Sequence, residues 1–371
     1  MSQTRPPLAE RGGPVRGLLE LATGSYPGFL FGGTVSNVLP VFHLHHADPV
    51  VLGAQLRYLA DNGYRTVTTN AIERVVLGGH SPEPHTVALC FDDCWASLWT
   101  VAGPLLRAHN MSAIAFAIPG RITDAPALRP TFEEHRATAT SVDTSDVPFA
   151  TWTELCELHS AGLLDIQSHT FSHSAVFAGS EVNGFITPTF AQRPLLDRPA
   201  MSDGLNWLSP ADLGAPLYLE RSRMSEGLRF YEDANVREQC IAHVATRGSG
   251  EFFRHPSWRA ELMAIASVAK GRTETADERA RAIEQELVSA RDLLQHRLGV
   301  PVPHVCMPWG IGGRAARAAL KRTGLRLAFM DRLFGRRAVA AGDDPHALMR
   351  LHERFIACLP GSGRRHFFNA R

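Results

Sequence analysis

One stretch of the chain, residues 111–118 with the sequence MSAIAFAI, is almost wholly apolar. Successive side chains of a β-strand point to opposite faces of its sheet, so a strand of this composition has both faces covered. Such strands are typical of parallel sheets that carry helices on both sides. The stretch therefore predicts an α/β fold.

Segments with strand and helix patterns alternate through much of the remaining chain. Strands are predicted over residues 37–44, 64–68, 87–91, 305–307 and 325–330 and from residue 164, and helices over 49–62, 71–77, 99–109, 152–161, 276–298 and 314–323. This repeated order predicts a parallel α/β barrel, which can be incomplete.

The pattern divides the chain into four parts. Residues 1–36 are polar, rich in proline and glycine and without clear periodicity, and we interpret them as an N-terminal extension. Residues 37–178 would form the first part of the barrel, and residues 277–371 its second part and the C-terminal tail. Residues 179–276 lack the alternation and are too long for a plain loop, so we expect an inserted subdomain.

The inserted subdomain is expected to be partly helical, over residues 236–245 and 258–269. Its arginines, among them Arg221, Arg223 and Arg254, could meet a phosphate or carboxylate group of a substrate. The simpler interpretation is that these arginines lie on the surface, and we favour it.

Composition excludes several classes of protein. The formal net charge of +1 gives no electrostatic argument for a nucleic-acid partner. Six cysteines in 371 residues do not indicate a disulfide scaffold. Residues 18–35 are interrupted by Glu20, Pro27 and glycines, so they predict neither a signal peptide nor a membrane span. We therefore expect a cytoplasmic protein with reduced thiols, whose oligomeric state stays open.

Two adjacent carboxylates, Asp92 and Asp93, follow the apolar run 87–91. Like charges this close repel each other unless solvent or a cation screens them, or unless the two groups take different roles. Catalytic carboxylates are commonly placed at strand ends in α/β proteins. A solvated turn is the alternative interpretation.

Two histidines, His169 and His173, follow another strand-like run in the sequence LLDIQSHTFSH. Residues four apart can face the same way from one helical turn and share a metal, although this spacing also arises by chance. One aspartate with two histidines is a plausible set of three ligands that leaves room for water. The coincidence of both clusters at strand ends favours a metal site.

Two further polar segments follow predicted strands. His43, His45 and His46 cluster at the end of the first strand, and His43 and His45 share one face of it by alternation. The sequence HVCMPWGIGG at 304–313 ends a strand at Pro308 and leads into a helix, as an ordinary strand-to-helix turn also does.

With these segments in view, the chain resembles the polysaccharide deacetylase family, also called the NodB-homology family or carbohydrate esterase family 4. CFDDC resembles the family motif TFDDG, SHTFSH resembles H-[ST]-x-x-H, and CMPWG resembles its Pro-aromatic-Gly motif. The N-terminal PVFHLHHADPVVLGAQLRYLADNGYRTV and the C-terminal DDPHALMRL resemble a permuted branch. The resemblance covers residues 39–177 and 277–355 and implies an irregular (β/α) barrel of about seven parallel strands.

The resemblance also implies roles for individual residues. Asp93, His169 and His173 would bind one divalent metal ion, and Asp92 would be the general base. The metal would most simply be Zn²⁺, with Co²⁺, Ni²⁺ or Mn²⁺ as alternatives. 

Two further roles come from the same resemblance. His45 would take the position of the general acid. The backbone N–H of Trp309 would help to hold the oxyanion, and its ring would form a wall of the pocket.

The chain departs from the family pattern at three positions. Cys90 replaces the usual Thr, and Cys94 replaces a Gly that tolerates backbone angles closed to cysteine. Cys94 is expected to be a buried filler, with a metal ligand or an oxidation-sensitive neighbour as the alternatives. The Arg that tethers the base in many members is not found, and Cys306 or Met307 stands in its place.

We therefore expect a metal-dependent hydrolase that removes an acetyl group from an N-acetylated sugar or glycan. One alternative is a hydrolase of the same fold that acts on a formamide, a cyclic imide or an acetate ester. A second alternative is a non-catalytic descendant that binds carbohydrate or a protein partner.

Overall fold

The computed structural model describes residues 14–134, 147–201, 206–267 and 271–370. Its contacts divide them into two compact units. The sheet unit contains the described residues up to 171, residues 286–310 and those from 320 onward. The second unit contains the described residues within 172–285 and residues 311–319. Residues 1–13 of the predicted N-terminal extension lie outside the described part.

The sheet unit is built on one parallel sheet, in the order β13-β12-β5-β4-β3-β1-β14, with β2 added beside β3. Every pair of neighbouring strands is parallel. The sheet curls into an incomplete barrel of seven strands, which confirms the predicted fold class. The strands are β1 (Val41–Leu44), β2 (Arg65–Thr66), β3 (Thr86–Asp93), β4 (Ala113–Ala117), β5 (Leu164–Ser168), β12 (His304–Cys306), β13 (Leu327–Phe329) and β14 (Leu351–His352).

Residues 345–352, which we call the closing segment, connect the two edges of this sheet. Near its start, Leu348 exchanges backbone hydrogen bonds of 3.0 and 2.9 Å with Ala328 and Met330, beside β13. Near its end, Leu351 lies in β14 and pairs with Phe42 of β1. The backbone of the short stretch between these two anchors is therefore held between β13 and β1.

Alternating side chains of the strands pack on opposite faces of the sheet. In β4, Ala113, Ala115 and Ala117 face one hydrophobic cluster, while Ile114 and Phe116 face another. All five are fully buried. The prediction that residues 111–118 form a strand covered on both faces is confirmed.

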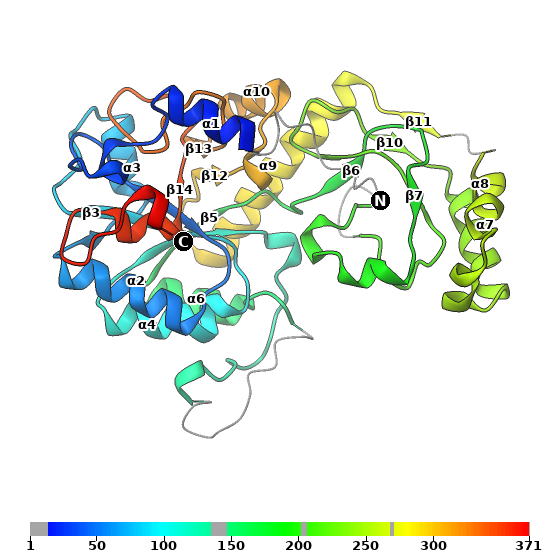
Figure 1. Ribbon diagram of the computed structural model, residues 1–371, viewed down its shortest axis with the longest axis horizontal. Coiled ribbons are helices and arrows are strands. Elements are labelled where there is room, and N and C mark those ends of the chain that lie inside the picture. The colour runs from blue at the N-terminus through cyan, green and yellow to red at the C-terminus, as the bar shows by residue number, and fades with distance from the viewer. Residues whose placement is uncertain (1–13, 135–146, 202–205, 268–270, 371) are drawn as a thin grey trace. The chain divides into compact units, whose positions relative to one another are not determined.

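Helices α2 (Pro49–Asp61), α4 (Gly103–Ala108) and α6 (Trp152–Ser160) lie side by side along one face of the sheet (Figure 1). Where α4 meets α6, a Cβ atom at Gly103 would come within 2.7 Å of a Leu158 methyl group, so a larger residue there would require the Leu158 side chain to shift. Asp48 caps α2, and Thr151 forms a capping box with Glu154 at the start of α6.

Further helices are α1 (Pro14–Ala22), α3 (Thr69–Val76), α7 (Ala234–Thr246), α8 (Trp258–Ala266), α9 (Ala276–Leu298) and α10 (Arg314–Thr323). A capping box precedes α9, since Thr275 and Glu278 exchange two hydrogen bonds. No helix within the described residues combines the length and apolar character that a membrane crossing requires.

Two local features differ in detail from the expectations. The helix predicted over 99–109 is present, but its first part, Leu98–Ala102, is π-helical and α4 follows it directly. The N-terminal extension contains α1 even though its sequence shows no clear period. A long-range ion pair accounts for part of this order, since the buried Glu20 accepts two hydrogen bonds, of 3.0 and 3.2 Å, from Arg337.

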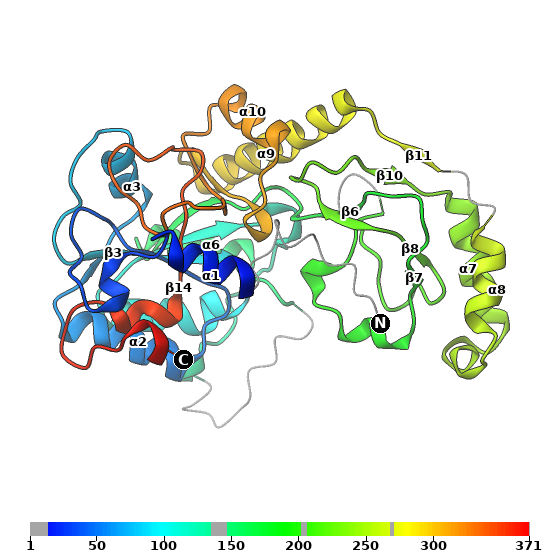
Figure 2. The ribbon, with the colours of Figure 1, turned by 45° about the horizontal axis from the view of Figure 1, so that its top comes forward.

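The second unit combines short antiparallel strand pairs with helices α7 and α8, which lie side by side in both ribbon views (Figures 1 and 2). The pairs are β6 (Ala175–Phe177) with β9 (Glu220–Ser222), β7 (Gly184–Phe185) with β8 (Pro216–Leu217), and β10 (Phe230–Tyr231) with β11 (Arg272–Thr273). Both predicted helices of this region are present, although residues 268–269 lie outside the described part.

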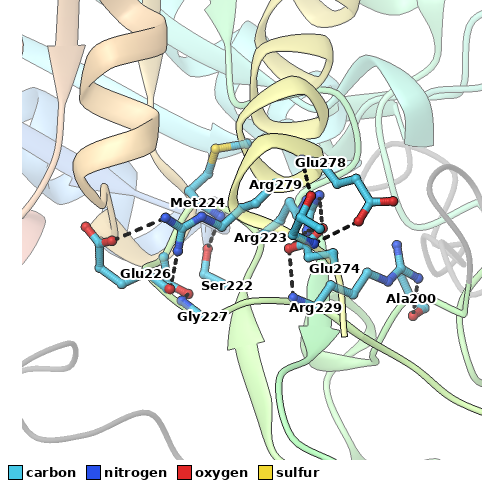
Figure 3. Close-up of polar contacts among 12 residues, drawn as sticks. Ala200, Ser222, Arg223, Met224, Glu226, Gly227, Arg229, Glu274, Glu278 and Arg279 are labelled. Atoms are coloured by element: carbon cyan, nitrogen blue, oxygen red, sulfur yellow. Dashed lines mark hydrogen bonds and ion pairs between the residues drawn. The ribbon is translucent and has the colours of Figure 1, made fainter. Parts of the chain in front are cut away.

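A buried ion pair in this unit corrects the assignment of Arg223 to the surface (Figure 3). Its guanidinium donates three hydrogen bonds of 2.8 to 3.0 Å to the carboxylate of Glu274, and both side chains are almost fully buried. Glu274 also accepts a bond of 2.7 Å from the backbone N–H of Arg229. Arg223 is therefore a structural residue, whereas the Arg254 side chain is exposed as expected.

Candidate active site

The polar clusters predicted at strand ends meet because the strands are parallel and in register. Asp93 at the end of β3 pairs with Ala117, which in turn pairs with Ser168 at the end of β5. His169 follows directly, and its backbone N–H donates to the Ala117 carbonyl at 2.7 Å. The carboxyl ends of β3 and β5 therefore place Asp93 and His169 together.

The ring of His169 is held in one orientation by the neighbouring strand. Its Nδ1 lies 2.7 Å from the backbone carbonyl oxygen of Cys306 in β12, and a carbonyl can only accept, so Nδ1 carries the proton. In the neutral ring Nε2 then carries the lone pair, and this nitrogen lies 3.4 Å from Oδ1 of Asp93. This arrangement is typical of histidine ligands, whose second nitrogen donates to a carbonyl or carboxylate.

Electrostatics at this ring favour a bound proton when no other cation is present. Burial opposes a charge on His169, but the side chains of Cys306, Asp93 and Asp92 outweigh it and raise its pKa well above the usual range. A metal ion that binds here would therefore displace a proton.

His173 joins these two residues, but not from a helical turn as predicted. The loop that follows β5 bends sharply, with left-handed φ angles of 65° at Thr170 and 52° at His173. Asp93, His169 and His173, all buried, offer ligand atoms that lie within 4.8 Å of one another. One carboxylate oxygen and two imidazole nitrogens form a donor set that suits a divalent transition-metal ion.

The carboxylate of Asp92 has a different partner. Arg350 on the closing segment donates two hydrogen bonds of 2.7 Å to it, one to each oxygen. Burial alone would raise the pKa of Asp92, but the guanidinium outweighs this effect and holds the pKa well below its usual range. The expectation that a tethering arginine is missing was wrong, because the arginine comes from another part of the chain.

Arg350 is itself held on several sides. Its guanidinium lies over the rings of Phe116, at 5.4 Å, and Phe329, at 5.8 Å, and one nitrogen is 3.0 Å from the sulfur of Cys306. Stacking and ion pairing together fix the plane of the guanidinium, and thus the plane of the Asp92 carboxylate.

His45 lies beside the same carboxylate, with 3.9 Å between its Nε2 and Oδ2 of Asp92. Half of the His45 side chain is exposed, so it can exchange protons with solvent. His43, behind it, is neutral, because burial and then the charge of Arg350 lower its pKa to about 3.

Two other groups of side chains also bring possible metal ligands within 4.8 Å: Asp92 with His43 and His45, and Asp92 with His169 and Cys306. Both include Asp92, whose two oxygens already bind Arg350. The group around Asp93 combines one carboxylate with two imidazoles, and we take it as the candidate metal site.

The remaining predicted positions lie at the same strand ends. Trp309 follows β12, half-buried, with a left-handed φ of 53°. Cys94 is fully buried with φ at 57°, so this position does adopt the backbone angle that favours glycine. Cys94 belongs to none of the possible metal groups among the described residues. Cys90 is buried in the cluster on the inner face of β3.

Two residues near the site were missed from the sequence. Arg350 lies within the quoted segment DDPHALMRL, but no local pattern distinguishes it from other arginines. Trp95 donates its indole N–H to Oδ2 of Asp93 at 2.9 Å. A search for the cation that a buried aspartate requires would have pointed to an arginine in general, but not to Arg350.

Comparison with known proteins agrees with this geometry. A family model described as polysaccharide deacetylase matches residues 79–203, which contain both aspartates and both histidines of the site. The poly-beta-1,6-N-acetyl-D-glucosamine N-deacetylase of Escherichia coli K12 is 28% identical over 185 residues. That match covers 50% of this chain but 25% of the relative, so the chain matches about a quarter of the relative's length.

Among solved structures, the deacetylase domain of BpsB from Bordetella bronchiseptica aligns with a TM-score of 0.50 and 18% sequence identity. The alignment covers 86% of this chain and 97% of that domain, and it supports the fold. The motifs, the curled parallel sheet and the matched family model agree with one another: over residues 79–203 this chain is similar to the polysaccharide deacetylase family.

Proposed function

We propose that this chain is a metal-dependent hydrolase that removes acetyl groups from an N-acetylated polysaccharide. The observation that carries the proposal is the division of two adjacent carboxylates between two environments. Asp92 is bound by Arg350, while Asp93 lies among two imidazoles. Neighbouring acids held in such different surroundings can take different roles.

The three residues Asp93, His169 and His173 would hold the metal. A divalent ion bound there would lower the pKa of a water molecule from about 15.7 towards about 7, and it would polarise the substrate carbonyl. The mixed nitrogen and oxygen donors favour zinc, and cobalt, nickel and manganese are the alternatives.

Asp92 would accept the proton of the attacking water. The two hydrogen bonds from Arg350 use one lone pair on each oxygen of Asp92. A carboxylate has about four lone-pair sites, so Asp92 can still accept a hydrogen bond from water. Arg350 makes Asp92 a weak base, but a weak base suffices when a metal ion has lowered the pKa of the water. Arg350 also keeps Asp92 ionised in a buried position, which burial alone would oppose.

His45 would return a proton to the departing nitrogen. Its ring is beside Asp92, so the acid and the base are on one side of the site. Attack of water on the acetamide carbon, with transfer of its proton to Asp92 and donation from His45 to nitrogen, yields acetate and a free amine. Trp309 would contribute its backbone N–H to the oxyanion and its ring to the pocket wall.

The choice of substrate rests on the relatives. The curated relative is named for a poly-β-1,6-N-acetyl-D-glucosamine, and a polymer or oligomer of N-acetylated glucosamine is the first substrate to test. A site without the tethering arginine would favour a different amide, and Arg350 supplies that arginine.

The test measures acetate release from poly-β-1,6-N-acetyl-D-glucosamine and its oligomers. The metal-stripped chain should be inactive and should recover on addition of about one equivalent of Zn²⁺ or Co²⁺. Formamides, cyclic imides and acetate esters serve as competing substrates in the same assay. Faster turnover of one of these, or acetate release that is unaffected by stripping the metal, would contradict the proposal.

A further inference from the structure

The indole of Trp95 contacts the metal ligand Asp93 in a way that the proposed mechanism does not use. Its Nε1 donates to Oδ2 of Asp93 at 2.9 Å, while Oδ1 of the same carboxylate faces His169 at 3.4 Å. The two oxygens of Asp93 are thus distinguished before any metal binds. An N–H donor on one oxygen leaves the other as the better ligand.

The backbone explains how Trp95 comes back onto a residue only two positions before it. Asp93 and Cys94 both have left-handed φ angles, of 69° and 57°, and the Cys94 N–H donates to the carbonyl of Asp92 at 2.9 Å. Two consecutive non-glycine residues in this region of backbone angles are strained. Such strain persists only where the surroundings hold the bend in place.

The segment 148–150 provides that hold. Ala150 donates its N–H to the carbonyl of Cys94, and Ala96 donates to the carbonyl of Pro148, both at 2.8 Å. These bonds anchor the chain on either side of Trp95. They also bring the Phe149 ring onto one face of the indole, with 4.7 Å between ring centroids and 22° between planes.

The His46 ring also packs against the indole, with 4.6 Å between ring centroids and 32° between planes. An aromatic side chain that stacks on a sugar needs a free face, and two rings already pack against Trp95. Its N–H, in contrast, is directed at Asp93. The ring is therefore built to hold a hydrogen bond rather than to bind substrate.

We propose that Trp95 is a positioning residue that fixes the Asp93 carboxylate as a one-oxygen ligand of the metal. The inference rests on the metal site of the proposed function and adds a determinant of its affinity. Loss of a hydrogen bond to a metal ligand commonly costs about 10–100-fold in affinity.

The chain offers a matched control. Trp99, also in the sheet unit, donates its indole N–H to the backbone carbonyl of Arg129 at 2.6 Å, away from Asp93. Trp95→Phe and Trp99→Phe each remove one indole N–H from a packed ring. Only the first removes it from the metal ligand.

The test measures Zn²⁺ affinity of the full chain by competition with a chelating dye, and the visible spectrum of the Co²⁺ form. Trp95→Phe should weaken Zn²⁺ binding about tenfold or more and change the Co²⁺ bands, whereas Trp99→Phe should leave both within about twofold of the unsubstituted chain. Equal affinities and spectra for the two variants would overturn the inference.

A measurement on the unsubstituted chain covers the case in which Trp95→Phe does not fold. One of the six tryptophan indole N–H resonances, and not the one lost in Trp99→Phe, should shift on addition of Zn²⁺. If no indole resonance other than that of Trp99 moves, Trp95 does not sense the site and the inference fails. If the unsubstituted chain binds no metal, the proposed metal site fails with it, which separates the two failures.

Discussion

Arg350 and Asp92 are 258 residues apart in the chain and are joined by two hydrogen bonds of 2.7 Å. The closing segment makes this contact possible, because its backbone bonds to β13 just before Arg350 and pairs with β1 just after it. The proposed catalytic base is therefore tethered by the same residues that join the two edges of the sheet. Integrity of the barrel and ionisation of the base are coupled by this geometry.

Substitution of Arg350 by methionine should damage both stability and activity. The variant leaves the buried carboxylate of Asp92 without its cation, and breaking a buried pair in this way costs about 3–5 kcal/mol in the free energy of unfolding. Arg350→Lys should recover part of the stability but not the fixed carboxylate plane. Chemical denaturation measures the first effect and acetate release the second.

The matched control is Arg354→Met, four residues further along, where the side chain is exposed. A surface substitution of this kind should change the free energy of unfolding by no more than about 0.5 kcal/mol. Equal stabilities for the variants at 350 and 354 would show that the ion pair contributes nothing.

The ion pair between Asp92 and Arg350 should also determine the pH dependence of activity. The folded-state pKa of Asp92 is depressed, so the stabilisation by Arg350 is fully present above the unfolded-state pKa and is lost as pH falls through the folded one. Arg350→Gln removes the main cause that lowers the pKa of Asp92, and burial, which raises the pKa of a carboxyl group, would then be opposed only by His169 and His45. The acid limb of kcat/KM should therefore move to higher pH in this variant. An unchanged acid limb would mean that Asp92 is not the group that titrates.

Much of the site could be predicted because its residues follow local patterns. An apolar run that ends in carboxylates or imidazoles can be read from a few neighbouring residues, and parallel register then brings such ends together, as it does for Asp93 and His169. Helices with strong periodicity and clear caps, such as α2 and α9, were found close to their observed bounds for the same reason.

What was missed depends on contacts between distant or strained segments. Nothing near Arg350 indicates that it meets Asp92, and nothing near Glu20 indicates its pairing with Arg337. The position of His173 depends on a loop that contains two left-handed residues. The spacing between His169 and His173 had suggested a helical turn instead. Tertiary contacts decide such features, and local propensity does not encode them.

The two adjacent aspartates should separate metal binding from turnover. Asp93→Ala removes a ligand and should lose both the bound metal and activity, because each ligand contributes to one shared site. Asp92→Asn keeps a similar shape and should retain about one metal per chain while activity falls about 10²-fold or more. Elemental analysis of the purified variants, set beside acetate release, distinguishes them. Normal turnover by Asp92→Asn would make the assignment of the base wrong.

The buried ion pair of the second unit gives a prediction that is independent of catalysis. Glu274→Ala leaves the guanidinium of Arg223 buried without its anion, and also removes the acceptor of the Arg229 N–H, so the free energy of unfolding should fall by about 3–5 kcal/mol. Glu251→Ala is the control, since its pair with Arg254 is exposed and worth no more than about 1 kcal/mol. The double variant Arg223→Met with Glu274→Met should recover part of the loss, because no unpaired charge remains buried. Denaturation monitored by a probe in the second unit measures the free energy of unfolding of all three variants. A double variant less stable than Glu274→Ala would show that the ion pair itself, rather than the unpaired charge, determines the stability.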